Sequence, residues 1–117
     1  MGRWTPSYVE RGRHVEVWEI MRGEEGLVEG YLFKRVKRDL NGYCLKFLPY
    51  FFAGFPDRIV LVPGGRIILV ETKAEDGEIS RRQRIRHVQL RKMGFDTRVI
   101  WTTAQVDKLI EEIRRYG

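Results

Sequence analysis

A hairpin signal in the middle of the chain constrains the fold more than any other feature. Two apolar runs, Arg58 to Val62 and Arg66 to Val70, are separated by Pro63-Gly64-Gly65, a composition typical of a β-hairpin loop. Each run is apolar on both faces, so we expect two central strands with cover on both sides. With a three-residue loop, Val62 faces Arg66 and the numbers of paired residues sum to 128.

Helical periodicity precedes the hairpin. Leu32, Val36 and Leu40 recur every four residues and predict a helix over 24–40, with Asn41-Gly42 as its stop. A strand is expected over 43–48. Glu29 falls in the middle of the apolar stripe of this helix, where an acid is costly without a partner. It is therefore a candidate for chemistry, and a glutamate bonded to a nearby Arg or Lys is the structural alternative.

Two further helices follow the hairpin. Ser80 and Gln83 form a capping-box pattern that starts a helix running to about Met93, and Thr102 and Gln105 repeat it before the last helix. A strand is expected over 97–101. The predicted order is helix, three strands, helix, strand, helix. Residues 1–23 are hard to place, because 14–17 alternate like a strand whereas Trp18 and Ile20 also suit a helix.

The hairpin register decides how the acidic residues are grouped. A three-residue loop places Asp57 opposite Glu71 and puts Lys73 on the same face, where two like charges require a cation. Acidic oxygens with a backbone carbonyl and waters suit Mg²⁺ or Mn²⁺. A two-residue loop would instead place Asp57 opposite Thr72 and separate the acids. The structural alternatives are a turn role for Asp57 and an ion pair between Glu71 and Lys73.

Composition excludes several classes of protein. The 117 residues contain one cysteine and two histidines, too few for an internal disulfide or a Cys/His zinc site, and the apolar runs are too short to cross a bilayer. No secretory signal is visible, so we expect a cytoplasmic protein. The net charge of +6 is clustered: residues 81–98 carry seven positive and one negative side chain, whereas 56–79 carry three and five.

The connected motifs resemble one nuclease family. Gly54-Phe55-Pro56-Asp57-Arg58, the Pro-Gly-Gly-Arg hairpin, Glu71-Thr72-Lys73 and the downstream Gln83 are similar to the PD-(D/E)xK superfamily, and more narrowly to its virus-type replication-repair nuclease (VRR-NUC) domain in the small standalone phage or viral form. Val28-Glu29-Gly30-Tyr31-Leu32 is similar to the family's acidic-x-Tyr-Leu opening. The resemblance implies an α/β fold, a restriction-endonuclease-like αβββαβ core with a C-terminal helix, as a nuclease domain over 24–117. Residues 1–23 would be an N-terminal extension, with an oligomerisation arm as one role.

The resemblance also implies roles for individual residues. Asp57 and Glu71 would ligate Mg²⁺ or Mn²⁺ together with the Thr72 carbonyl, and Glu29 would hold either a metal-bound water or a second ion. Lys73 would position the attacking water, and Gln83 is the family's downstream glutamine.

The resemblance implies branched DNA as the partner, in a phage or bacterial host cell and without a small-molecule cofactor. We expect a metal-dependent, structure-selective endonuclease, a Holliday (four-way) junction resolvase acting as a homodimer; a flap or other branched-DNA nuclease and a non-catalytic DNA-binding module are the alternatives. The aromatic loop over 50–55 suits a core or dimer interface, or base stacking. Phosphate contacts are expected from basic side chains on both flanks of the acidic centre: Lys34, Arg35, Lys37, Arg38, Lys46, Arg58, Arg81, Arg82, Arg84, Arg86 and His87.

Overall fold

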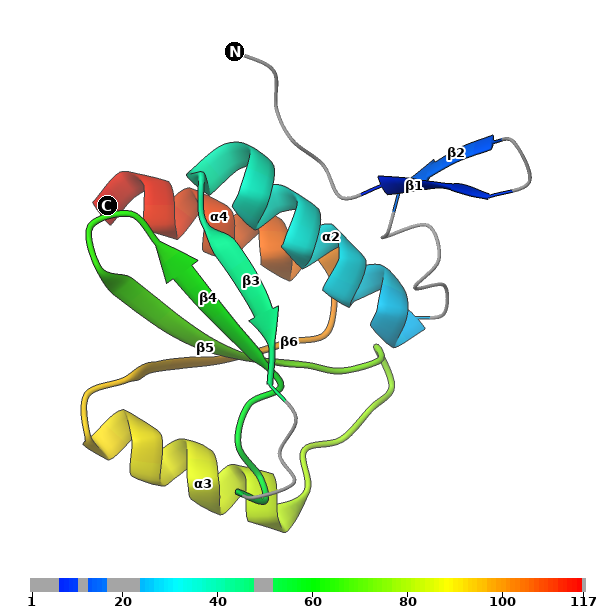
Figure 1. Ribbon diagram of the computed structural model, residues 1–117. Coiled ribbons are helices and arrows are strands. Elements are labelled where there is room, and N and C mark those ends of the chain that lie inside the picture. The colour runs from blue at the N-terminus through cyan, green and yellow to red at the C-terminus, as the bar shows by residue number, and fades with distance from the viewer. Residues whose placement is uncertain (1–6, 11–12, 17–23, 48–51, 117) are drawn as a thin grey trace.

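The computed structural model describes residues 7–10, 13–16, 24–47 and 52–116. It shows the expected α/β architecture, with one additional hairpin near the N-terminus (Figure 1). The elements in chain order are β1 Ser7–Glu10, β2 Arg13–Glu16, α2 Glu24–Leu40, β3 Tyr43–Lys46, β4 Arg58–Val62, β5 Arg66–Thr72, α3 Arg81–Lys92, β6 Asp96–Ile100 and α4 Thr103–Tyr116. From α2 onward, this is the predicted αβββαβ core followed by a C-terminal helix.

One mixed sheet organises the chain, with strand order β3-β4-β5-β6. The first two pairings are antiparallel, and β5 runs parallel to β6. A parallel neighbour requires a crossover connection, and α3 supplies it. Strands β1 and β2 form a separate two-stranded sheet within the segment that sequence patterns left unplaced.

The three-residue hairpin loop is confirmed. Val62 pairs with Arg66 and Arg58 with Val70, so paired numbers sum to 128 throughout the ladder. Gly64 and Gly65 have φ of 94° and 80°, values that favour glycine and explain the loop composition. The predicted helix stop is also confirmed: Asn41 has φ of 53°, and a Cβ on Gly42 would lie 2.3 Å from the Leu61 carbonyl oxygen. The backbone crossing from α2 into β3 thus requires a residue without a side chain.

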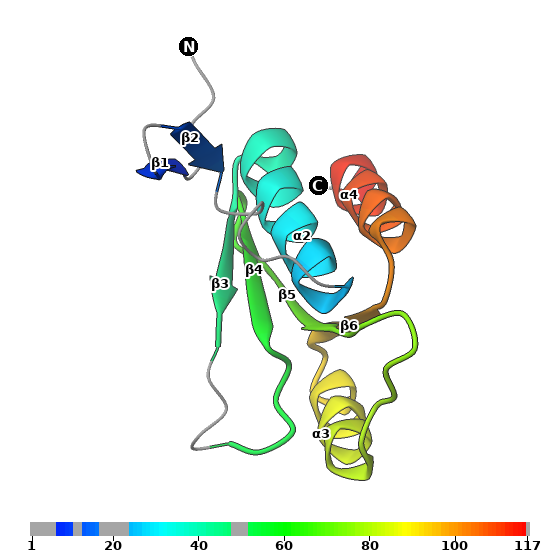
Figure 2. The ribbon, with the colours of Figure 1, turned by 90° about the vertical axis from the view of Figure 1, so that its right-hand side faces the viewer.

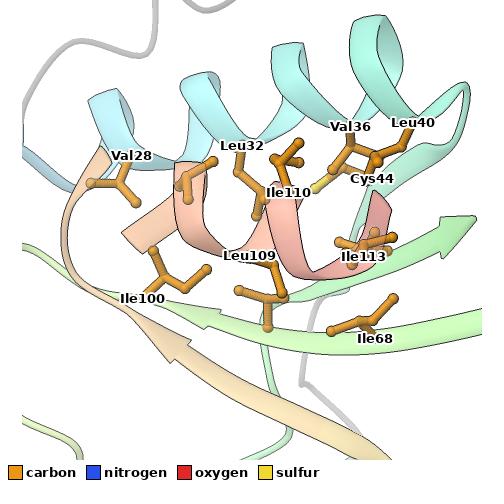
Figure 3. Packing of buried hydrophobic residues seen from close by; sticks show 13 residues of the cluster. Val28, Leu32, Val36, Leu40, Cys44, Ile68, Ile100, Leu109, Ile110 and Ile113 are labelled. Carbon is orange, nitrogen blue, oxygen red and sulfur yellow. The ribbon is translucent and has the colours of Figure 1, made fainter. Parts of the chain in front are cut away.

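The hydrophobic core lies between the sheet and the pair α2 and α4 (Figure 2; Figure 3). Leu32 and Val36 of α2 and Ile110 of α4 are fully buried against Val60 and Val70 of the sheet. The four-residue spacing in α2 therefore marks its core face, as predicted. Cys44 belongs to this cluster.

The predicted cover of the second sheet face is incomplete. Helix α3 packs beside β6 on this side (Figure 2). Leu45 of the edge strand β3 is 46% exposed, and Ile67 of the central strand β5 is 47% exposed. The expectation of two fully covered central strands was therefore wrong for this part of the sheet. No helix of the described segments is long and apolar enough to span a membrane.

Candidate active site

The predicted acids gather where β4 begins and β5 ends. Extending the β4–β5 register by one position places Asp57 opposite Glu71. Asp57 immediately precedes β4, and Thr72 is the last residue of β5. Glu29 approaches from α2, which lies along the core side of the sheet (Figure 1). Three segments far apart in the chain thus supply acidic side chains to one end of the sheet.

Thr72 joins two of these carboxylates. Its backbone N–H donates to Asp57 Oδ1 at 2.9 Å, and its hydroxyl oxygen lies 2.8 Å from Asp57 Oδ2 and 2.9 Å from Glu29 Oε1. The Thr72 side chain is fully buried. Only its carbonyl was singled out from the sequence. The signal that was missed is the strand alternation. Side chains two residues apart on β5 point to the same face, so Thr72 points toward α2 like Ile68 and Val70.

The Asp57 carboxyl has a perturbed pKa. Burial raises the pKa of Asp57 to about 6, and the neighbouring Glu29 acts in the same direction. Hydrogen bonds from Thr72 and the charge of Arg58 oppose this rise. A carboxyl with a raised pKa in a buried, acid-rich position is typical of functional sites.

Arg58 closes the network on its other side. Its Nη2 donates to Glu29 Oε2 at 2.5 Å, and the two side chains are 5% and 12% exposed. This partner is the structural alternative considered for Glu29, but Glu29 also contacts Thr72 and so belongs to the acidic cluster as well. Arg58 was expected among the phosphate contacts. The structure places it in the interior, because the buried Glu29 carboxylate needs a cation.

Glu71 and Lys73 lie on the opposite face of β5 from Thr72. Lys73 Nζ is 4.0 Å from Glu71 Oε2, and the Glu71 side chain is only 6% exposed. The two therefore share a face and an ion pair, as the period of two predicts. The Asp57 carboxylate, in contrast, contacts the Thr72 amide and hydroxyl and so points toward the α2 side of the sheet.

A divalent metal fits this donor set by its chemistry. Asp57 and Glu71 offer carboxylate oxygens at one end of the sheet, and the Thr72 carbonyl stands beside them; hard oxygen ligands of this kind suit Mg²⁺ or Mn²⁺. A cation would also offset the burial of the acids that raises the pKa of Asp57. Within the described segments, no three His, Cys, Asp or Glu side chains are close enough together to hold a metal. Water and the backbone would therefore complete the ligand set.

Helix α3 begins with the predicted capping box. The Ser80 side chain accepts from the Gln83 N–H at 3.1 Å, and Gln83 Oε1 accepts from the Ser80 N–H at 2.9 Å. The Gln83 side-chain oxygen is therefore engaged at the helix start.

The basic side chains of α3 divide between different surroundings. Arg81, Arg82 and Arg84 are exposed. Arg86 donates to the Ala53 carbonyl and lies 3.8 Å above the Phe52 ring, part of the aromatic loop whose residues 50 and 51 fall outside the described segments.

His87, in contrast, is 2% exposed. Burial, together with the charges of Arg91 and Lys73, lowers the pKa of His87. It is thus an interior residue, unlike the surface phosphate contact expected from the sequence.

The cations of α2 are partly engaged within the protein. Arg35 forms ion pairs with Asp39 and with Asp107 of α4, and Arg38 pairs with Asp39. Lys37 lies 4.5 Å above the Tyr43 ring. Arg35 therefore fastens α2 to α4, a role that the basic pattern did not reveal. Lys34 is half-buried, and Lys46 on β3 is exposed.

Comparisons with known proteins point to nucleases. The chain is 33% identical over 76 residues to "Putative nuclease p44" of Acyrthosiphon pisum secondary endosymbiont phage 1, covering 65% of this chain and 81% of that protein. A solved structure described as "VRR_NUC domain" superposes with a TM-score of 0.70 at 35% identity, over 77% of this chain and 97% of the other. No family model matches the chain.

Proposed function

Since the chain belongs to the VRR-NUC family, we propose that it is a Mg²⁺- or Mn²⁺-dependent, structure-selective DNA endonuclease, most specifically a four-way-junction resolvase acting as a homodimer. The observation that carries the proposal is the gathering of Glu29, Asp57 and Glu71 at one end of the sheet: Thr72 contacts both Asp57 and Glu29, and Glu71 pairs with Lys73. A phage or bacterial host cytoplasm is the proposed compartment.

The acids and the Thr72 carbonyl would hold the metal. Asp57 and Glu71 would be the direct carboxylate ligands, and Glu29 would act through a water. When bound, a divalent ion supplies an acidified water and charge neutralisation on the scissile phosphate. The Thr72 amide fixes the Asp57 carboxylate, and Arg58 fixes that of Glu29, so the ligand oxygens are positioned before substrate arrives.

Lys73 is the proposed water-positioning residue. Its ammonium lies near Glu71 and its side chain is 20% exposed, so it is within reach of a substrate at the sheet end. A fixed cation there would orient the nucleophile and stabilise charge that develops on the phosphate. Gln83 would contribute through its position in the first turn of α3, while its side-chain oxygen holds the cap.

DNA would be held by the exposed cations. The main group consists of Arg81, Arg82 and Arg84 of α3. Further phosphate contacts would come from Lys46 of β3 and from the less exposed Lys34, Lys37 and Arg38 of α2. Contacts of this type read the phosphate backbone and not the base sequence. They therefore support recognition of DNA shape. Arg35, Arg58 and His87 would contribute by holding the surrounding structure.

The decisive experiment compares substrates and metals. The protein is incubated with four-way junctions, flaps, single strands and duplex, each with Mg²⁺, Mn²⁺ or EDTA. Junction cleavage that needs a divalent metal is expected, and Lys73→Ala should reduce its rate by about 10²-fold or more. Lys108→Ala, an exposed change on α4, is the matched control and should keep the rate.

Other outcomes select the alternatives. Preferential cutting of flaps would favour a flap nuclease. Binding of branched DNA without cleavage under any metal condition would favour a non-catalytic module. Sedimentation at micromolar concentration tests the homodimer separately, and a monomeric mass would contradict it.

A further inference from the structure

A cavity lies beside the acidic cluster, between α3, β6 and the loop that leaves β5. Its volume is about 540 Å³, within the range of small-ligand sites. Its lining is mostly basic and apolar, with one acid. It includes Arg84, His87 and Arg91 from α3, Val99 and Trp101 from the β6 region, and Glu78 from the loop. We call it the α3 cleft.

The α3 cleft lies next to β5, the strand that carries Glu71. Val99 pairs directly with Glu71 in the parallel β5–β6 ladder. Paired residues on neighbouring strands point to the same face, so both side chains lie on the α3 side of the sheet. The cleft therefore opens one strand away from the Glu71 carboxylate and its partner Lys73.

One face of α3 forms the charged wall. Arg84, His87 and Arg91 are spaced three and four residues apart and so share a helix face. Arg91 Nε donates to the Thr97 carbonyl at 3.0 Å, which anchors its guanidinium beside β6. Arg81 and Arg82 line a different surface hollow. The helix thus presents Arg84 and Arg91 to the cleft and Arg81 and Arg82 to the other hollow.

His87 adds an unmet hydrogen-bonding group. Its side chain is buried, and its Nε2 has no hydrogen-bond partner within the described part of the chain. A buried polar atom without a partner is costly, which indicates that a ligand completes it. Arg84 and Arg91 outnumber the one acid of the lining, Glu78, so an anion is the favoured ligand.

The opposite wall is apolar and rigid. The Trp101 indole N–H donates to the Gly77 carbonyl at 2.8 Å, which fastens the ring to the loop. Val99 continues this apolar side. An aromatic face and two guanidinium groups in one cleft suit a base together with its phosphate.

We propose that the α3 cleft is a nucleotide subsite, which holds the phosphate and base of a nucleotide next to the one that is cut. The proposal rests on the proposed function, because it places this nucleotide on the substrate strand beside Glu71. Arg84 and Arg91 bind the phosphate, and Trp101 contacts the base. The site is separate from the metal-holding acids.

The test is direct binding of deoxythymidine 5′-monophosphate in EDTA, so that it needs neither metal nor cleavage. Trp4→Phe/Trp18→Phe leaves Trp101 as the single tryptophan, whose fluorescence reports occupancy; calorimetry on the unchanged chain is the second measurement. We expect saturation below ~10 mM and about ten-fold weaker binding for Arg84→Gln. Lys92→Gln removes the same charge from an exposed site on α3 outside the cleft and should bind within about two-fold of the unchanged chain. Circular dichroism verifies the fold of each variant.

The outcomes are distinguishable from those of the cleavage assay. Absence of saturable binding, or equal losses for Arg84→Gln and Lys92→Gln, overturns the subsite whether or not DNA is cut. Inorganic phosphate binding as tightly as the nucleotide overturns the base contact. Nucleotide binding in a protein that cleaves no DNA retains the cleft as a nucleotide site and overturns the nuclease proposal alone.

Discussion

Asp57 accepts two hydrogen bonds from a single residue, Thr72: one from the backbone N–H at 2.9 Å and one at the hydroxyl, 2.8 Å away. The same hydroxyl lies 2.9 Å from Glu29. A hydroxyl has one proton to donate, so it cannot satisfy both carboxylates at once. The pair of acids is thus held in place yet left short of positive charge, which is the condition under which a cation binds well.

Thr72→Val should distinguish the role of the Thr72 hydroxyl in positioning the two carboxylates from the role of its side chain in packing. The change keeps the shape of the side chain and removes the hydroxyl, leaving two carboxylate oxygens without their shared donor. We expect a loss of about 1–3 kcal/mol in the free energy of unfolding, measured by urea denaturation, and weaker nuclease activity. Thr72→Ser restores the hydroxyl and should recover most of the activity. Equal activity for the Val and Ser variants would contradict a role for the hydroxyl.

The Arg58–Glu29 pair predicts a strongly non-additive response. Arg58→Met leaves Glu29 buried without its cation and should cost about 3–5 kcal/mol in the free energy of unfolding. Glu29→Leu/Arg58→Met removes both charges, so we expect it to recover most of that loss while abolishing cleavage. Thermal denaturation of the single and double variants measures the coupling. A double variant as unstable as Arg58→Met would show that the pair does not act as a unit.

Local patterns carried most of the fold. Helix α2 begins and ends where its apolar period and the Asn41-Gly42 stop indicate, and the β4–β5 register follows from Pro63-Gly64-Gly65. These features depend on neighbouring residues alone. Incomplete cover over Ile67 was not predictable in this way, because it depends on where α3 packs after the crossover to β6.

The candidate site was predictable as a set of residues but only partly as a geometry. Sequence alternation brings Glu71 and Lys73 to one face. It does not reveal that Asp57, just outside β4, turns its carboxylate to the Thr72 amide. The burial of Arg58 and His87 was missed for a related reason. The sequence does not show whether a basic side chain lies on the surface or in the interior, because that depends on which residues pack around it.

Asp39 should stabilise the fold in a pH-dependent way. The hydrogen bond from Arg38, and then that from Arg35, lower the pKa of Asp39 from 3.8 to about 2, against the effect of burial. A lowered folded-state pKa contributes stability that is present above about pH 4 and is lost as the pH falls toward 2. Asp39→Asn should therefore cost about 0.5–1 kcal/mol at pH 7. Urea denaturation of both proteins should show this gap closing between pH 4 and 2; a constant gap would contradict the ion pairs with Arg35 and Arg38.

Cys44 should be inert in the folded protein. It is buried in the core beside α2, and burial raises the pKa of its thiol to about 12. The thiolate is the reactive form, so the raised pKa leaves very little of the thiol available at pH 8 even if reagent could enter. We expect no reaction with Ellman's reagent over an hour in native buffer and one equivalent after unfolding in guanidinium, since the chain has one cysteine. Leu45→Cys, at a half-exposed neighbouring position on the open sheet face, is the matched control and should react promptly without denaturant. Rapid native labelling of Cys44 itself would mean that β3 separates from α2 readily, contrary to the packing of this cluster.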